Sequence, residues 1–241
     1  MKNNTKSTLS LAAAVAAVLT LAPAAQAAIL LETFSGSDTA NIAGSTADSG
    51  QTWVAVNNTT FKQDGTVTGG KGAYLPFTLT QGTTYTLEVQ WTGTLDNRLE
   101  VGFSVGARGG DTPPGDPAYQ ADIWSWMYVG GAGSQPVNSQ VYTGNGYNGG
   151  IGGVYNWAGN TMTIVLDTTN ASNYAMEVFD ANGSVASGSL GSAPAITHVF
   201  YGTDGNITTG KIDNLTLIPE PATMSLLAIG GIALIRRRRR A

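Results

Sequence analysis

The sequence predicts an all-β protein, a single two-sheet antiparallel β-sandwich of the jelly-roll kind, with an apolar segment at each end. Three observations predict it. Apolar and polar residues alternate with a period of two along several short segments. Turn-forming dipeptides separate these segments, and no stretch between Ala28 and Ile218 shows a helical period. Many short strands at near-regular spacing are typical of a two-sheet sandwich.

The expected strands begin in the first half of the chain. The clearest one covers residues 84–91, where the apolar members of the alternation are Tyr85, Leu87, Val89 and Trp91. The same period recurs over residues 98–105, 162–166, 174–178 and 197–201. The turn signals are Asp64-Gly65, Gln81-Gly82, Asn182-Gly183 and Asp204-Gly205. Each of these strands is therefore expected to bury one face and expose the other.

The body of the chain, residues 28–218, is long enough for one domain with its own core. Without Lys2, Lys6, Glu220 and the arginines of residues 236–240, the chain carries 5 basic and 15 acidic residues, a net charge of −10. Such a surface should repel nucleic acid. With no cysteine and one histidine, His198, the chain has no usual ligand set for zinc or other transition metals. Oxygen ligands remain, so calcium is the metal left to consider.

The N-terminus has the three parts of a secretory signal peptide. Lys2 and Lys6 supply positive charge, Leu9–Ala22 are mostly apolar, and the A-x-A cleavage site is Ala25-Gln26-Ala27. The sequence therefore predicts a signal peptide over residues 1–27 and a mature chain that begins at Ala28. The Sec export machinery and signal peptidase are the expected partners. A single uncleaved membrane helix is the alternative.

The last 23 residues combine a proline-flanked glutamate, an apolar run and a block of positive charge. Proline disfavours helix, so Pro219, Glu220 and Pro221 are expected to be extended and accessible. The apolar run Met224–Ile235 is shorter than the roughly 20 residues of an ordinary spanning helix, which favours a transient membrane segment. The positive-inside rule keeps the arginines in the cytoplasm, namely Arg236, Arg237, Arg238, Arg239 and Arg240. A short tail anchor that is never cut is the alternative.

The tail reads Pro219-Glu220-Pro221-Ala222-Thr223, then Leu226-Leu227, Gly230 and the arginine block. It resembles the PEP-CTERM sorting signal of Gram-negative bacteria, with Ile218 and Gly231 as small departures. The resemblance implies recognition by an exosortase, a membrane transpeptidase that processes its substrate near the Pro-Glu-Pro motif. It also implies that residues 219–241 hold the exported protein at the inner membrane before delivery to the cell surface or an exopolysaccharide matrix.

The strand rhythm of the body supplies a second resemblance, carried by Leu30–Phe34, Thr163–Asp167 with Tyr174–Phe179, and Lys211–Leu217. It is similar to the rhythm of concanavalin- and laminin-G-like sandwiches. In such folds the first and last strands often lie side by side, which implies that Glu32 lies near Asp213. These two carboxylates are the candidate ligands of a structural calcium. The alternative is that both are solvated edge residues, because calcium needs roughly six oxygens. No other cofactor is expected.

The stretch between Gly106 and Gly159 is rich in glycine and aromatic residues. Aromatic rings stack on the apolar C–H faces of sugars, and long loops on a rigid sandwich commonly carry binding residues. The candidate glycan-binding residues are Trp124, Trp126, Tyr142, Tyr147 and Trp157. For Trp124 and Trp126, which share a strand face, core packing is the alternative. The other three lie among glycines and are expected to be exposed.

Three functions remain open for the body. The favoured one is a non-catalytic module that associates with extracellular polysaccharide. The others are a purely structural matrix or surface protein without a specific ligand, and a polysaccharide-degrading hydrolase or lyase. The paired-carboxylate motif of sandwich glycosidases is absent, and Glu88 and Glu100 fall on different expected strands. His198 has no evident base–nucleophile partners. The sequence therefore predicts no enzyme and no catalytic residue.

Overall fold

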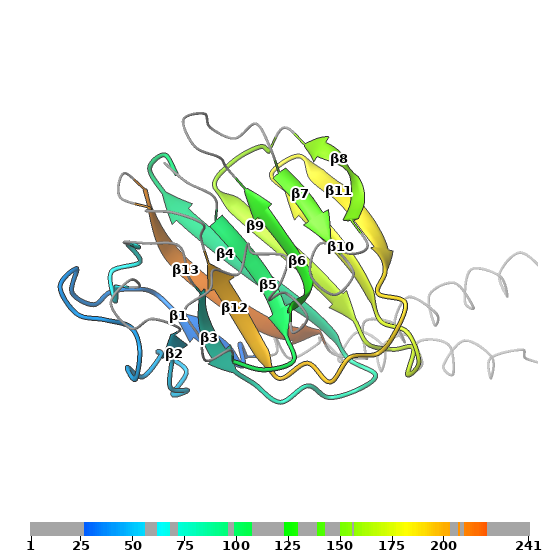
Figure 1. Cartoon of the computed structure of the whole chain (residues 1–241), viewed down its shortest axis with the longest axis horizontal. Coiled ribbons are helices and arrows are strands. Elements are labelled where there is room, and N and C mark those ends of the chain that lie inside the picture. Colours follow the sequence, from blue (N-terminus) through cyan, green and yellow to red (C-terminus); the bar gives the residue numbers. More distant parts are fainter. Residues whose placement is uncertain are drawn as a thin grey trace, which may run out of the picture. The chain divides into compact units, whose positions relative to one another are not determined.

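The computed structural model describes residues 27–55, 62–67, 72–95, 99–107, 123–129, 139–142, 150–155, 157–202, 207 and 210–220. Residues 27–220 form one compact unit, and its described elements are all β-strands (Figure 1). The strands are β1 (Leu30–Glu32), β2 (Val54–Ala55), β3 (Gly72–Pro76), β4 (Thr84–Thr92), β5 (Leu99–Ser104), β6 (Ile123–Val129), β7 (Ser139–Tyr142), β8 (Gly150–Tyr155), β9 (Thr161–Asp167), β10 (Ala175–Asp180), β11 (Gly183–Ser189), β12 (His198–Gly202) and β13 (Lys211–Glu220).

The strands form two sheets whose strand pairs are antiparallel, and together they make a sandwich (Figure 1). The six-stranded sheet has the order β1-β13-β4-β9-β10-β11, and the seven-stranded sheet has the order β2-β3-β12-β5-β6-β7-β8. The predicted all-β, two-sheet antiparallel fold is thereby confirmed. The first and last strands pair directly, with Leu30 opposite Leu217, as the resemblance to concanavalin-like sandwiches implied.

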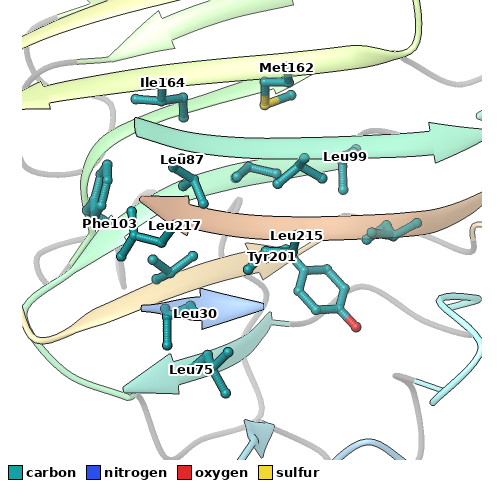
Figure 2. Close-up of a cluster of buried hydrophobic side chains, with 14 of the residues drawn as sticks. Leu30, Leu75, Leu87, Leu99, Phe103, Met162, Ile164, Tyr201, Leu215 and Leu217 are labelled. Atoms are coloured by element: carbon teal, nitrogen blue, oxygen red, sulfur yellow. The ribbon is translucent and has the colours of Figure 1, made fainter. Parts of the chain in front are cut away.

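The five segments with the clearest alternation all become strands, namely β4, β5, β9, β10 and β12. In β4 the apolar positions Tyr85, Leu87, Val89 and Trp91 are buried, and the residues between them are only partly buried. Successive side chains of a strand point to opposite faces, so a period of two places one apolar row against the other sheet. The four residues belong to the core cluster, and Figure 2 shows Leu87 among buried side chains of both sheets.

Strand β5 differs from its prediction, because all six of its residues are buried. Its polar side was expected to face solvent, but Glu100 and Ser104 are 0% exposed. On that side Gly102 lies opposite Phe200 of β12, whose ring centroid is 6.2 Å from that of Tyr74. Tyr74 and Phe200 are themselves buried although neither belongs to the core cluster. An alternating pattern shows which face is more apolar, but it cannot show that the other face is also covered.

The Asp64-Gly65 turn contacts the last strand, β13. Gly65 has a φ of 84°, and a Cβ there would lie 1.9 Å from the carbonyl oxygen of Ile212 in β13. The Ile212 amide donates to the Gly65 carbonyl at 3.1 Å. Only glycine allows both this left-handed backbone and this close approach.

Candidate functional site

The proline-flanked glutamate is part of the sandwich. Strand β13 continues through Pro219 and Glu220, which lie opposite Tyr85 and Thr84 of β4. The expectation of an extended backbone therefore holds for these two residues, whereas Pro221 lies outside the described residues. Accessibility differs from the expectation, because Pro219 is buried and Glu220 is partly buried.

A side-chain hydrogen bond holds the end of this strand. The Thr86 hydroxyl donates to Oε1 of Glu220 at 3.1 Å. Thr86 lies opposite Ile218, and Glu220 is two residues further along β13. On the inner face Pro219 lies opposite Tyr85, which is buried, and directly opposed residues of antiparallel strands are close enough to pack. The sequence alone contained no signal for the partnership between Thr86 and Glu220, because 134 residues separate them.

Strand β13 tolerates a proline at position 219 because β1 is not paired with it there. Leu217 directs its carbonyl toward β1, where it accepts the Ile29 amide at 2.9 Å. Backbone polar groups alternate sides along a strand, so Pro219 faces β1 as Leu217 does. Strand β1 is paired only over Leu30–Glu32, and Pro219 lies beyond that pairing. The missing N–H therefore costs β13 no hydrogen bond toward β4.

The N-terminus expected after signal cleavage lies beside the same strand end. Continuing the β1–β13 register by two residues brings Ala28 to the level of Pro219. Ala28 is partly buried and Ala27 is exposed. Ala25, the first residue of the expected cleavage site, lies outside the described residues, as do Arg236, Arg237, Arg238, Arg239 and Arg240. In the described part of the chain, no helix is long and apolar enough to span a membrane.

The aromatic candidates on β6 and β7 occupy adjacent strands of the seven-stranded sheet. Trp126 lies opposite Tyr142 of β7 on one side and opposite Gly102 of β5 on the other. Trp124 lies opposite Phe103, past a register shift between Gly102 and Phe103. The structure thus brings Trp126 and Tyr142 together in register, although their side chains lie outside the described part. Tyr147 lies outside the described residues altogether.

Trp157 was expected to be exposed, and that expectation is wrong. Its side chain is 3% exposed and belongs to the core cluster. The segment that carries it is fastened to the end of the β10 strand, where the Ala158 amide donates to Oδ2 of Asp180 at 3.0 Å. The glycines on both sides of Trp157 suggested an open loop, but the tryptophan side chain itself is buried. Among the described residues its indole N–H has no hydrogen-bond partner.

Glu32 and Asp213 do not converge on one site. Glu32 is 8% exposed, and its carboxylate accepts the Phe34 amide and the Trp53 indole N–H, each at 2.8 Å. Asp213 is exposed beside the irregularity in β13, and the residue opposite Glu32 is Leu215. Both carboxylate oxygens of Glu32 are thus already used by protein donors. In the described residues no three acidic or histidine side chains cluster as a metal site would require.

Glu32 instead supports an aromatic cluster. Trp53 and Phe34 each lie edge-on to the Tyr201 ring, with centroid distances of 5.5 and 5.6 Å. Burial is the main reason that the pKa of Tyr201 is raised well above its ordinary value, and the negative charges of Glu32 and Asp64 raise it further. Tyr201 therefore remains protonated in the fold and acts as a core residue.

Glu88 and Glu100, the two carboxylates considered for a hydrolase, lie in different sheets. Glu88 lies on β4 of the six-stranded sheet and Glu100 lies on β5 of the seven-stranded sheet. Glu88 accepts the Gln90 side-chain amide at 2.7 Å. A shallow hollow of about 410 Å³ on the outer face of the six-stranded sheet includes Asp167 and Glu177, which sequence reasoning had not singled out. Asp167 already accepts the Thr169 amide at 2.8 Å.

His198 is a structural residue of β12. Its Nδ1 lies 2.8 Å from the Thr197 hydroxyl, and its ring centroid lies 6.4 Å from that of Tyr74. Partial burial lowers the pKa of His198 below its ordinary value of 6.5, because the charged imidazolium loses hydration.

An NMR titration of the His198 ring should therefore give a folded-state pKa below 6.5. Because this pKa is lower than in the unfolded chain, the stability linked to His198 is complete above about pH 6.5 and is lost as the pH falls through the folded-state pKa. His198 is the only histidine, so its signals need no assignment by mutation. The urea-unfolded chain is the control and should titrate near 6.5. A folded value at or above that of the control would contradict the burial argument.

The fold and the strand end define an all-β sandwich domain whose last strand leads directly into a C-terminal targeting tail. Residues 217–240 match the family model described as the PEP-CTERM protein-sorting motif. This match confirms the resemblance seen in the sequence, and the motif implies an exported protein that an exosortase processes and that its C-terminus anchors at the membrane before processing. The match includes the last four residues of β13.

Comparison with curated proteins found no match. Comparison with solved structures found β-sandwich domains. A legume lectin-like domain from Entamoeba histolytica has a TM-score of 0.43 at 8% identity, covering 65% of this chain and 84% of that one. A protein of unknown function from Shewanella oneidensis MR-1 has a TM-score of 0.44 at 11% identity, covering 79% of this chain and 85% of that one. The VIP36 exoplasmic/lumenal domain, in a form bound to Ca²⁺ and Man, has a TM-score of 0.40 at 9% identity, covering 71% and 84%. These are likenesses of strand arrangement and assign no ligand to this chain.

Proposed function

We propose that this protein is an exported, exosortase-processed component of the cell surface or exopolysaccharide matrix, and that its sandwich is a non-catalytic module that associates with polysaccharide. The sorting motif over residues 217–240, continuous with the last strand of the sandwich, carries the first part of this proposal. The Sec machinery and signal peptidase act before the exosortase, on residues 1–27.

Support for glycan association comes from the aromatic positions of the seven-stranded sheet. Trp126 and Tyr142 are opposed on neighbouring strands, whereas Trp124 lies opposite the core residue Phe103. Opposed residues of an antiparallel pair occupy the same face of a sheet. Two aromatic residue types at opposed positions of adjacent strands suit stacking against the apolar face of a sugar, whereas the Trp157 side chain belongs to the core cluster.

The non-catalytic assignment is supported by the separation of Glu88 and Glu100, the two carboxylates that the sequence left as a possible pair. Glycoside hydrolysis needs two carboxylates about 5 to 9.5 Å apart across the scissile bond. Of the described carboxylates, Glu32 is buried under two hydrogen bonds, and Glu88 and Glu100 belong to different sheets. None of these forms such a pair.

Binding and turnover can be measured in one experiment. Residues 28–220 are incubated with soluble and insoluble polysaccharides, in calcium and in chelator, while the supernatant is assayed for released reducing ends. We expect saturable binding without release, and Trp126→Ala or Tyr142→Ala should weaken it about tenfold, the equivalent of 1.4 kcal/mol. Phe179→Ala is the matched control, because Phe179 is a partly buried aromatic residue of the other sheet, outside the core cluster.

Each other outcome selects an alternative. The absence of binding to every polysaccharide would favour a purely structural matrix protein. Release of reducing ends would show an enzyme and overturn the non-catalytic assignment. Binding that disappears in chelator would revive a calcium site in the part of the chain that the structure does not describe.

A further inference from the structure

Residues Pro219 and Glu220 have two incompatible roles. They are the first two residues of the Pro-Glu-Pro motif that an exosortase must reach, and they are also the last two residues of β13. Enzymes that cut or transfer peptides bind an extended segment whose backbone groups and side chains are free to contact the enzyme. In the sandwich, the backbone of these two residues is paired with β4, Pro219 is buried, and Glu220 is bonded to Thr86.

We propose that the folded sandwich withholds the Pro219-Glu220 half of the motif from the exosortase, so that processing proceeds from chains in which the end of β13 has left β4. This inference rests on the proposed function, because it concerns the same exosortase step. The rate of processing then follows the population of chains with an open strand end, as proteolysis does when opening and closing are fast.

The required opening is local. Toward β1, the pairing of β13 stops at Leu217, so residues 218–220 are held mainly from the β4 side. Strand ends with few partners open at a small fraction of the free energy of global unfolding. Release of these three residues leaves the pairs from Lys211 to Leu217 in place, so the domain need not unfold in order to be processed.

Thr86 is the positioning residue in this scheme. Its hydroxyl is the side-chain donor that holds the Glu220 carboxylate against β4. A hydrogen bond to a charged acceptor is stronger than a neutral one, and its loss should raise the population of the open end about fivefold. Thr86 lies outside the matched motif at residues 217–240, so the sequence of the signal is unchanged in a Thr86 variant.

The first test moves the motif out of the sheet. A six-residue Gly/Ser insertion between Ile218 and Pro219 lets the inserted residues occupy the last strand positions and leaves the whole tail unchanged. The full chain is pulse-labelled in a strain that carries an exosortase and in one that lacks it, and loss of the tail is followed by gel shift and mass spectrometry. We expect the insertion variant to be processed at least about fivefold faster than the wild type. The same insertion at the exposed Asn182-Gly183 turn is the matched control and should leave the rate unchanged.

The second test changes one hydroxyl. Thr86→Val should be processed about fivefold faster than the wild type, because the variant keeps the shape of the side chain and loses the bond to Glu220. Thr163→Val is the matched control. Thr163 is also a partly buried threonine on the outer face of the same sheet, opposite Glu88, and the substitution brings the same gain in β propensity. Thermal melts of the purified variants verify that each remains folded.

The outcomes separate this inference from the proposed function. If the wild type is processed equally in both strains, or in neither, the exosortase assignment fails. If processing needs the exosortase but the insertion and Thr86→Val variants match the wild-type rate, the exosortase assignment stands and the withholding of the motif is overturned. Faster processing of Thr163→Val, to the same extent as Thr86→Val, would likewise overturn the role of Thr86.

Discussion

Trp157→Ala should lower the free energy of unfolding by about 3–5 kcal/mol, the usual cost of truncating a large buried aromatic side chain. Trp157 follows β8 and precedes β9 in the sequence, and its side chain is 3% exposed and belongs to the core cluster. Its removal leaves a cavity that the surrounding core can fill only partly, because protein interiors are close-packed. Chemical denaturation of residues 28–220, followed by tryptophan fluorescence and circular dichroism, measures the change.

The control for this prediction is Phe179→Ala. Phe179 is an aromatic residue that is only partly buried and lies outside the core cluster, so its truncation should cost about 1 kcal/mol or less. Equal losses for the two variants would contradict the burial of Trp157. A Trp157→Ala protein that keeps its stability and loses glycan binding would restore the exposed position that the surrounding glycines suggested.

Glu32→Ala should cost about 3–5 kcal/mol, because it removes the acceptor of two buried donors at once. The Phe34 amide and the Trp53 indole N–H would both remain in the core without a partner, and each such donor costs about 1–3 kcal/mol. Glu32→Gln should cost less, about 1–2 kcal/mol, since an amide keeps one oxygen acceptor and presents a donor to the other N–H. Urea denaturation of both variants gives the comparison.

Asp48 supplies a matched control for Glu32. Its Oδ2 also accepts two hydrogen bonds, from the amide and the hydroxyl of Thr33, but it is exposed to solvent. Water replaces the lost acceptor at an exposed site, so Asp48→Ala should cost about 1 kcal/mol. Similar losses for Glu32→Ala and Asp48→Ala would show that burial does not set the effect. A gain of stability in Glu32→Ala would indicate that the buried carboxylate serves a ligand at the expense of the fold.

The C-terminal sorting tail and the strand rhythm could be predicted from local patterns, whereas the signal peptide over residues 1–27 stays a prediction. The sorting tail is read by its order of residue types along the chain, which no fold is needed to establish, and the family match to residues 217–240 confirms it. The period-two alternation of β4 and β9 also predicted these strands and their buried faces. An apolar row on one face of a strand must pack against another layer.

The burial and the neighbours of individual side chains were predicted less well. The glycines around Trp157 indicated a loop, but a loop residue can still turn into the core, and the sequence carries no record of that direction. Glu100 had the polar position of a one-sided strand and is nevertheless fully buried, because β5 lies in the middle of its sheet with covered faces on both sides. The pairing of Glu32 with Asp213 assumed that adjacent strands bring their acidic residues together, whereas the register and the irregularity in β13 separate them.

Local sequence therefore determined the sorting signal of this protein and its class of fold, since targeting segments and strand periodicity are properties of consecutive residues. Only the tertiary structure showed that the sorting motif begins within the last strand of the sandwich, at Pro219 and Glu220. Thr86 and Glu220 are far apart in the chain and meet only because β13 pairs with β4 in the six-stranded sheet. Burial and register depend on which strands become neighbours, and the packing of the whole core decides this. As a result, two residues of a sorting motif also occupy the last two paired positions of β13.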